Sequence, residues 1–454
     1  MRTMNLTEGR PWRLLLFFSL PLMAGNIFQQ LYTIVDTAVV GRVLGVDALA
    51  ALGAVDWLNW LTLGAIQGFT QGFAILMAQK FGAQEYQRLR QVVANSVILS
   101  VICAAVLTVT SEGLAGTVLG LLQTPEEIRQ ISMAYLRIIF GGIPVVMAYN
   151  LAAAILRALG NGRTPLVAMV IASVMNIGLD FLFVLGFGWG VQGAAAATVL
   201  AQGLSAVYCF LHICKLEILR MERTDWKMQA ALGTRLMKLG APMAFQNTVI
   251  SVGGMIVQMV VNGFGVVFIA GFTATNKLYG LLETAATSYG YAMVTYAGQN
   301  LGAGKLKRVS KGLQAGLVIS VFTSLFITAC MIGFGKVILG CFISAEGAQG
   351  EAALRIAYRY LCIMAVFLPV LYLLHVTRSC IQGLGNTVLP MVSGIAEFIM
   401  RTGAALLLPV LFAENGIFYA EVLAWAGADL ILVPSYFYVR RRLEQNGMKW
   451  NRST

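Results

Sequence analysis

The sequence predicts an all-α polytopic membrane protein with twelve transmembrane helices in two six-helix lobes, related by a pseudo-twofold axis along the membrane normal. Of its 454 residues, 58% are hydrophobic and only 11% are charged, and the mean hydropathy is +0.77. Soluble domains carry about 25% charged residues, so this composition excludes a water-soluble protein. The apolar runs are long and uninterrupted, which favours helices over the short alternating strands of a transmembrane barrel.

Twelve apolar runs separated by polar breaks give the predicted spans, since a crossing needs roughly 20 apolar residues. The spans of the first lobe are 13–40, 50–79, 91–111, 132–157, 165–187 and 192–214. The spans of the second lobe are 236–262, 270–299, 312–335, 356–380, 387–411 and 416–439. The first run lacks a small-residue cleavage site after a short apolar core, so we expect a retained span and no signal peptide.

The distribution of basic residues predicts the orientation in the membrane. With the N-terminus in the cytoplasm, 24 of the 32 Lys and Arg residues fall in cytoplasmic segments, Arg378 among them, and 4 fall in outer loops. Cytoplasmic loops carry the excess of Lys and Arg, so both termini are expected to be cytoplasmic. The net charge of +12 is spread over every inner loop, which argues against a nucleic-acid partner.

The chain carries an internal duplication. The segment at 19–30 aligns loosely with 240–251, and the pattern LGNxxxP at 159–165 returns at 384–390. Each copy holds six spans, an even number, so both copies begin and end on the cytoplasmic side, with a central cavity between them. The predicted domains are an N-terminal lobe at 1–214, a cytoplasmic linker at 215–235 and a C-terminal lobe at 236–454.

The first span carries a carboxylate, Asp36, inside its apolar run. An ionisable group within a span costs about 2.5–3.5 kcal/mol on insertion scales, and it normally faces a protein interior or a watery cavity where it has a function. At helical spacing, one face of this span carries Gln29, Tyr32, Thr33 and Asp36. Pro21 removes a backbone donor from the same helix and is therefore a candidate hinge.

The fifth span repeats this theme with Asn176 and Asp180, which stack on one helical face because they are four residues apart. The second copy does not repeat these groups. At an offset of 225 residues, the pair corresponds to Arg401 and Ala405. The acidic groups are therefore confined to the N-terminal lobe, and this asymmetry points to a specific role there.

Several features together resemble multidrug and toxic compound extrusion (MATE) transporters. These are the two six-helix halves, an S-L-P-L span ending in V-D-T-A, the F-G-A and L-G-A loops after spans 2 and 8, and the paired LGNxxxP turns. The resemblance covers nearly the whole chain. It implies a multi-pass exporter of organic cations and other amphipathic drugs in a prokaryotic inner membrane, driven by inward flow of H⁺ or Na⁺.

Within that family, the N-terminal lobe matches the prokaryotic DinF-like branch. The branch has an acid in span 1, an Asn-xxx-Asp in span 5 and a Thr in span 6, which here are Asp36, Asn176, Asp180 and Thr198. The resemblance implies that these four residues form the cation-coupling site. Another branch places acids in spans 7 and 10, and this sequence has none in those spans.

Helix lengths place the four residues at similar depth without reference to any family. Asp36 lies about 34 Å along the helix from Arg13, and Asp180 lies about 22 Å from Pro165, at 1.5 Å per residue. Thr198 lies about 9 Å below the outer end of its span. All fall in the outer half of the membrane, and their oxygen atoms suit H⁺ or Na⁺ rather than a soft metal. The alternative to a coupling role is that Asp36 and Asp180 form hydrogen bonds that pack the helices together.

Other polar residues are candidates with weaker support. The candidate lining of a substrate cavity consists of Gln29, Tyr32, Gln67, Asn150 and Glu283. Glu397 and Arg401 are four residues apart, which predicts an ion pair inside the bundle and leaves a second coupling site as the alternative. His375 has no acid, Cys or His close to it in the sequence, which favours a packed polar residue over a ligand.

Other function classes fit the sequence less well. An enzyme is not expected, because the two histidines lie in different spans and no H-E-x-x-H motif occurs. A lipid-linked saccharide flippase, or an exporter of a specific metabolite, is the alternative that shares the two-lobe plan. The expected partners are small amphipathic or cationic substrates and membrane lipid, with a monomeric protein and no cofactor besides the coupling ion. The choice between H⁺ and Na⁺ stays open.

Overall fold

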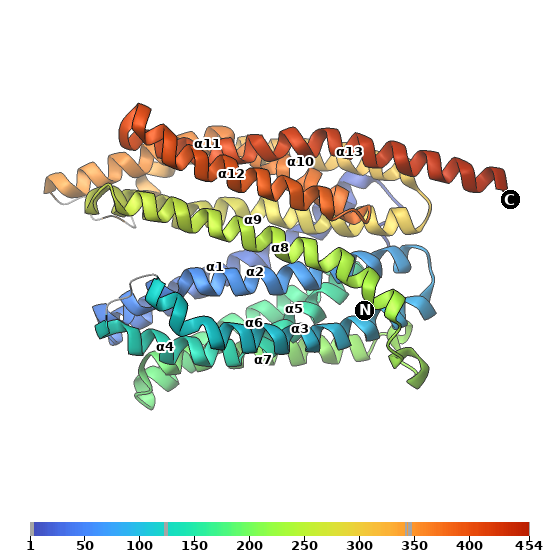
Figure 1. Ribbon diagram of the computed structural model, residues 1–454, viewed down its shortest axis with the longest axis horizontal. Helices are drawn as coiled ribbons and strands as arrows, with labels where there is room; N and C mark the ends of the chain where they lie inside the picture. The colour runs from blue at the N-terminus through green and yellow to red at the C-terminus, as the bar shows by residue number, and fades with distance from the viewer. Residues whose placement is uncertain (1–3, 122–125, 341–342, 344–346, 454) are drawn as a thin grey trace. The chain divides into compact units, whose positions relative to one another are not determined.

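The computed structural model describes residues 4–121, 126–340, 343 and 347–453, and every regular element in these ranges is helical (Figure 1). The first copy contains α1 (Pro11–Val43), α2 (Val46–Gly82), α3 (Tyr86–Leu121), α4 (Glu126–Gly141), α5 (Ile143–Ala158), α6 (Arg163–Asp180) and α7 (Gly190–Cys214). The second contains α8 (Ala230–Asn262), α9 (Val266–Gly302), α10 (Leu306–Gly340), α11 (Gly347–Gly383), α12 (Val388–Phe412) and α13 (Ala420–Ser453). The predicted all-α membrane fold is confirmed.

Most of the predicted spans fall on one of these helices. The fourth falls on two, the fifth continues from α6 into a π-helical segment at Phe181–Gly186, and the twelfth begins in a 3-10 segment at Ala413–Tyr419. The helix Ile128–Gly141 and the helix Ile143–Ala158 meet at an angle of 46°. Pro144, at the start of α5, supplies no backbone N–H to the preceding turn, which accounts for the break. The apolar run continues through the bend, so hydropathy alone does not reveal it.

By length and composition, nine helical stretches in the described part of the chain can cross a membrane, or up to ten if the bent pair is one span. One of the nine, 388–445, joins the predicted eleventh and twelfth spans. Helix α9 is not among them, although its 37 residues are more than long enough to cross. The helices run past the predicted spans because their polar ends continue the backbone hydrogen bonding beyond the apolar run.

The chain packs into two compact units. The first unit comprises Met1–Asn5 and Leu20–Thr248, and the second comprises Leu6–Ser19 and Val249–Thr454. Helix α1 therefore changes unit immediately before Pro21, and α8 changes unit shortly after its own internal Pro242. The predicted lobes at 1–214 and 236–454, with a linker at 215–235, remain a prediction.

Small residues allow two helices of the first unit to approach closely. A Cβ atom on Gly68 of α2 would lie 2.3 Å from the Cα atom of Ala244 in α8, and one on Gly72 would lie 2.4 Å from the Cα atom of Gly240. Membrane helices commonly pack through such small residues four positions apart. Any larger side chain here would separate α2 from the N-terminal half of α8.

Stacked aromatic rings form part of the core of the second unit. The rings of Phe272 in α9 and Tyr360 in α11 have centroids 4.8 Å apart. Tyr360 also lies 5.1 Å from Phe418, which stacks in turn on Phe268 at 5.5 Å. Phe418 belongs to the short 3-10 segment Ala413–Tyr419 (η4) between α12 and α13. These stacked rings fix α9, α11 and η4 against one another.

The two copies of the repeat build the same loops. Gln84 and Gly304 have positive φ angles of 58° and 70°, and each donates its N–H to the carbonyl three residues earlier. In both LGNxxxP turns the asparagine, one residue ahead of the N-cap, accepts a hydrogen bond from the first turn of the following helix. Asn161 Oδ1 accepts from Thr164 N–H and Asn386 Oδ1 accepts from Leu389 N–H, each at 3.1 Å. The duplication read from the sequence is therefore present in local geometry.

The segment ahead of α1 is held by the second unit. The N–H of Leu6 donates to Oε1 of Gln299 at 2.9 Å, and Nδ2 of Asn300 donates to the Leu6 carbonyl at 3.1 Å. Nζ of Lys305 donates to the carbonyl of Thr7 at 3.1 Å. Leu6 is fully buried, so this short segment is part of the folded unit rather than a loose extension.

Candidate functional site

Helix α6 places two of the predicted coupling residues on one buried face. Asn176 is 1% exposed and Asp180 is 0% exposed. Their spacing of four residues stacks the amide and the carboxyl group along the helix, as the sequence predicts. Two polar side chains with no access to solvent, within a helix long and apolar enough to cross a membrane, mark the centre of the candidate site.

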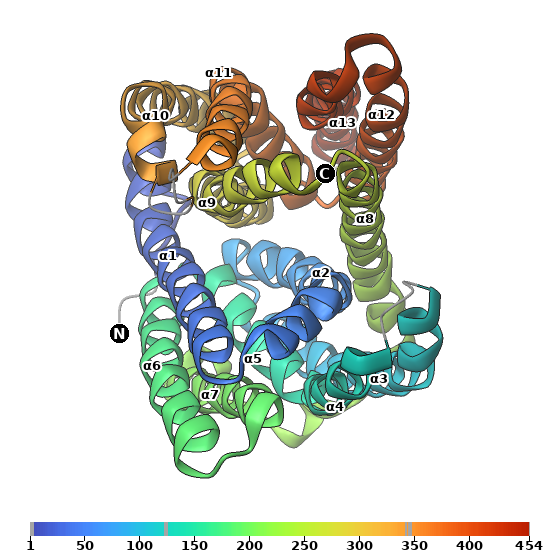
Figure 2. The same cartoon turned by 90° about the vertical axis from the view of Figure 1, so that its left-hand side faces the viewer.

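Thr198 of α7 joins this face. Nδ2 of Asn176 donates a hydrogen bond to Oγ1 of Thr198 over 3.4 Å. Helices α6 and α7 pack side by side along their length, as Figure 2 shows from the helix ends. Three of the four predicted coupling residues thus lie on two helices in direct contact.

The buried oxygen atoms determine what this arrangement can bind. Oδ1 of Asn176 and both carboxylate oxygens of Asp180 are shielded from solvent. Oδ1 of Asn176 has no hydrogen-bond donor within the described ranges. Amide, carboxylate and hydroxyl oxygens are ligands for hard cations, and a buried carboxylate also accepts a proton. The site therefore has the chemistry to hold H⁺ or Na⁺.

The chain changes its helical pitch immediately after Asp180. Residues Phe181–Gly186 form a π-helical segment (η1), which the apolar pattern of the sequence does not predict. Phe183 of this segment stacks on Trp189 with ring centroids 4.9 Å apart. Wider π-turns inside membrane helices are frequent at functional sites, because they reorient the side chains next to them. The carboxyl group thus lies at the junction of two helix types.

Helix α1 approaches this site, although the side chain of Asp36 lies outside the described residues. Oγ of Ser173 in α6 donates to the carbonyl of Phe28 at 3.4 Å, and Phe28 immediately precedes Gln29. Gln29 and Tyr32 are both half-buried. The predicted polar face of α1 therefore begins next to α6, within one turn of Asn176. The part assigned to Asp36 remains a prediction.

The other predicted residues of the first unit lie on separate helices. Gln67 in α2 and Asn150 in α5 are half-buried, and these two helices pack against each other. Nδ2 of Asn150 donates to the carbonyl of Val146 in its own helix at 2.9 Å. Helix α1 continues through Pro21, which is half-buried. The cavity-lining and hinge roles of these residues stay predictions.

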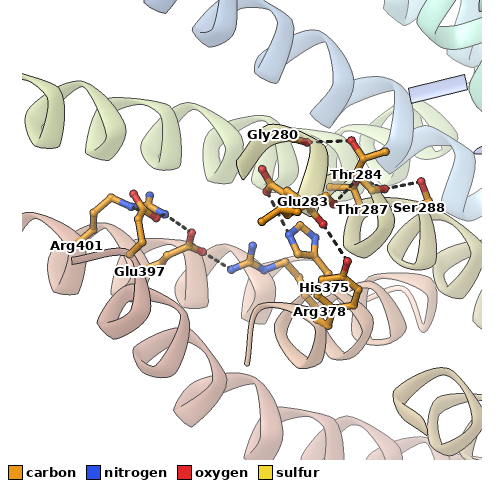
Figure 3. A network of polar contacts seen from close by, with 12 residues as sticks. Gly280, Glu283, Thr284, Thr287, Ser288, His375, Arg378, Glu397 and Arg401 are labelled. Atoms are coloured by element: carbon orange, nitrogen blue, oxygen red, sulfur yellow. Dashed lines mark hydrogen bonds and ion pairs between the residues drawn. The ribbon is translucent and has the colours of Figure 1, made fainter. Parts of the chain in front are cut away.

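In the second unit, Glu283 is paired with a histidine. Oε1 of Glu283 in α9 lies 3.4 Å from Nε2 of His375 in α11 (Figure 3). The side chain of Glu283 is 36% exposed and that of His375 is 18% exposed. From the sequence we expect Glu283 in the cavity lining and His375 as a packed polar residue. The two groups are far apart in the sequence, so spacing within one helix does not connect them.

A buried chain of charges joins Arg378 of α11 to Glu397 and Arg401 of α12 (Figure 3). Glu397 accepts from Nη2 of Arg378 at 2.6 Å and from Nη2 of Arg401 at 2.9 Å. Arg401 also donates to Glu421 at 2.8 Å. The predicted Glu397–Arg401 ion pair is confirmed, and it is the centre of a four-residue network that spans three helices.

The structure corrects the predicted position of Arg378. The Lys and Arg count from the sequence places this residue among the cytoplasmic ones, but the residue is 7% exposed and bonded to Glu397 inside the second unit. The apolar run of α11 ends close to Arg378, so hydropathy assigns it to the membrane surface. Glu421 is absent from the predicted site residues, although a carboxyl group inside an apolar run is the same signal that identifies Asp36 and Asp180.

Comparisons with known proteins agree with this architecture. A family profile named MatE matches residues 21–182 and 242–406. The chain is 30% identical to the probable multidrug resistance protein YpnP of Bacillus subtilis, over 92% of this chain and 93% of that protein. It is 26% identical to the probable multidrug resistance protein NorM of Thermotoga maritima, over 92% and 89%.

Solved structures share the fold. A crystal structure of MATE in complex with MaL6 superposes with a TM-score of 0.89, over 98% of this chain and 99% of that chain, at 21% sequence identity. An outward-facing multidrug resistance MATE family transporter of the MOP superfamily gives a TM-score of 0.88, over 98% of both chains, also at 21% identity. At this level of identity the likeness concerns the fold alone.

Proposed function

The chain belongs to the MatE family, and on that basis we propose that it is a secondary active antiporter. It would export organic cations and other amphipathic drugs across the inner membrane in exchange for inward flow of H⁺ or Na⁺. The observation that supports the coupling step is Asp180, fully buried one helical turn from Asn176, which donates to Thr198. An ionisable group inside a membrane helix is functional by default.

The coupling follows from the cost of burying a negative charge. A carboxylate without water favours a bound proton, a bound cation or a cationic substrate nearby. A ligand shifts a conformational equilibrium only by its difference in affinity between the two states. If coupling ion and substrate each neutralise the same carboxyl group, binding of one weakens binding of the other, and this reciprocity links inward ion flow to outward drug flow.

The same site accommodates either ion. Na⁺ would take oxygen ligands from Asn176 Oδ1, Thr198 Oγ1 and the Asp180 carboxylate, whereas H⁺ needs only the carboxylate. Asp36, on the helix that passes next to α6, is our proposed second carboxyl group. The amide and carboxyl side chains of Gln29, Gln67, Asn150 and Glu283, with the phenol of Tyr32, are the proposed polar lining of the substrate path.

The charges of the second unit argue against a saccharide flippase. A flippase carries an anionic headgroup and needs cations that remain available inside the membrane. The buried guanidinium groups of Arg378 and Arg401 are instead neutralised by Glu397 and Glu421. Export of cationic and amphipathic drugs is therefore the better supported substrate class, in line with the names of the relatives.

Reconstituted protein tests the proposal. Proteoliposomes loaded with a fluorescent organic cation would be given an imposed proton gradient or an imposed Na⁺ gradient in separate experiments. We expect one gradient to drive dye movement in the wild type and neither to do so in Asp180→Asn. Glu217→Gln, an exposed acid outside the helical bundle, is the matched control and should transport normally. Wild-type rates in Asp180→Asn would overturn the coupling role.

A further inference from the structure

Asp429 of α13 is a buried carboxyl group that the proposed coupling site does not use. The residue is 7% exposed, and both of its carboxylate oxygens are shielded from solvent. Within the described residues neither oxygen has a hydrogen-bond partner. An ionised carboxylate in that position would lose its hydration without receiving a hydrogen bond in the arrangement seen here. A buried carboxyl group of this kind avoids the cost by taking up a proton or a cation.

The charged groups around Asp429 come from the helices packed against α13. Helices α11 and α12 both contact α13, and the charges that act on Asp429 are Arg378 from α11 and Glu397 from α12. Nη2 of Arg378 is bonded to Glu397, whereas its Nε atom is buried without a partner in the described ranges. Within the described residues, Arg378 Nε is therefore a hydrogen-bond donor without an acceptor, and the two oxygens of Asp429 are acceptors without a donor.

The charges of the four ion-paired residues near Asp429 balance one another, which favours the protonated, neutral form of Asp429. Arg378 and Arg401 carry two positive charges, and Glu397 and Glu421 carry two negative charges, all joined by ion pairs. Asp429 is the carboxyl group in excess of that balance. If it ionised in place, the cluster would hold a net negative charge in an apolar bundle. A metal cation is disfavoured as the neutralising ion, because the guanidinium group of Arg378 would repel it.

A cavity lies one helical turn along α13 from this carboxyl group. It has a volume of about 210 Å³ and lies among α10, α11 and α13. Its lining includes Arg440, Tyr436 and Val433, and Val433 is one helical turn from Asp429. Thr377, which also lines the cavity, is the neighbour of Arg378. The side chain of Arg440 is 38% exposed and marks the end nearer to solvent. The volume exceeds that of a water molecule.

From these observations we propose that Asp429 is a reversible proton-binding site of the second unit, separate from the acidic site of the first. In the state described here the carboxyl group holds the proton and the Arg378–Glu397 ion pair is closed. On release, the O–H bond of Asp429 breaks and the proton passes to water in the adjoining cavity. The carboxylate then accepts the hydrogen bond that Arg378 Nε has to offer. The proposal concerns proton binding alone and does not depend on which substrate the protein exports.

Infrared difference spectroscopy on the purified full-length protein tests this assignment without any transport measurement. A protonated carboxylic acid has a carbonyl-stretch band that an ionised carboxylate lacks. We expect the wild type to show such a band that is lost as the pH rises, and Asp429→Asn to lack that band. Asp180→Asn and Glu217→Gln should both retain it. The carboxyl groups of the first unit can contribute bands of their own, so the decisive comparison is between the wild type and Asp429→Asn. Identical sets of pH-dependent bands in these two proteins, or no such band in the wild type, would overturn the proposal.

Two further measurements keep the test decisive. If Asp429→Asn fails to fold, the double variant Asp36→Asn/Asp180→Asn, which lacks both proposed coupling acids, can be labelled with ¹³C-aspartate, which shifts the bands of aspartic but not glutamic acids. A pH-dependent band that shifts in this variant supports Asp429, and the absence of a shifted band excludes it. Titration with Na⁺ at fixed pH should leave the band unchanged. Its loss on Na⁺ addition would mean a metal-cation site and would contradict the proton assignment.

Discussion

Nη2 of Arg378 in α11 lies 2.6 Å from Oε2 of Glu397 in α12, and both side chains are almost completely buried. The other carboxylate oxygen of Glu397 bonds Arg401, so one acid neutralises parts of two guanidinium groups. A buried ion pair of this kind contributes little net stability when it is intact, yet removing one partner leaves an uncompensated charge. Glu397 is thus the residue on which the network depends.

Glu397→Gln is expected to destabilise the protein by about 3–5 kcal/mol, because Arg378 loses its charged partner and Arg401 keeps only Glu421. Thermal unfolding in detergent, followed by intrinsic fluorescence, measures the change. Glu414→Gln, at an exposed acid in η4, is the control and should unfold at the same temperature as the wild type. Normal stability together with complete loss of transport would instead make Glu397 a coupling residue.

Thr198→Val removes the hydroxyl group that accepts from Asn176 while keeping the shape of the side chain. One lost hydrogen bond corresponds to about 0.5–1.5 kcal/mol, which weakens the apparent affinity for the coupling ion about 2- to 12-fold. Dye efflux measured against ion concentration gives that affinity. In the control, Thr110→Val, the exposed hydroxyl group bonds only carbonyls of its own helix, so no change is expected. Equal affinities in both variants would remove Thr198 from the site.

Membrane topology is tested with two equally accessible positions. The side chains of Arg88 and Glu126 are 69% and 77% exposed, so a cysteine at either position is reachable from the adjoining solvent. In a cysteine-free background, an impermeant thiol reagent added to intact cells should label Glu126→Cys and leave Arg88→Cys unreacted. The predicted orientation follows from the excess of basic residues on the inner side. The opposite labelling pattern would invert the topology.

Gly265, ahead of α9, has a φ angle of +91°, and a Cβ atom added there would meet no other atom within 4 Å. Gly265→Ala should therefore destabilise through backbone strain alone, by about 1–2 kcal/mol. Gly333 has the same open space but an ordinary helical backbone, so Gly333→Ala should be neutral or slightly stabilising. Unfolding midpoints of the two variants give the comparison. Equal midpoints would show that strain at Gly265 is not significant.

The sequence is sufficient to place the candidate residues Asn176 and Asp180 together, but not to assemble the ion-pair network of the second unit. Asn176 and Asp180 share one helix, so their spacing alone places them together. Arg378 and Glu397 lie on different helices, and nothing in the local pattern indicates which helix faces which. Asp429 carries the same signal as Asp180, a carboxyl group in an apolar run, but its burial and lack of partners among the described residues emerge only once α11, α12 and α13 are packed.

Two irregularities in the helices, a bend and a π-helical segment, cannot be predicted from hydropathy, and for a different reason. The bend between α4 and α5 and the π-turns after Asp180 both occur inside continuous apolar runs. Hydropathy records which residues prefer lipid, and it is insensitive to a change of helix direction or pitch. Pro144 is a local signal for the bend, whereas the π-helical segment at Phe181–Gly186 has no comparable marker.

The docking of Leu6 sets an order for biosynthesis. Its hydrogen-bond partner Gln299 lies 293 residues later in the chain, so Leu6 emerges from the ribosome long before its binding surface exists. Helix α1 must therefore enter the membrane while the segment ahead of it is still undocked, and that segment is secured only after α9 and α10 are complete. Contacts of such high sequence separation form late in folding. A half-length chain ending in the 215–235 segment would carry Leu6–Ser19 without the unit to which those residues belong.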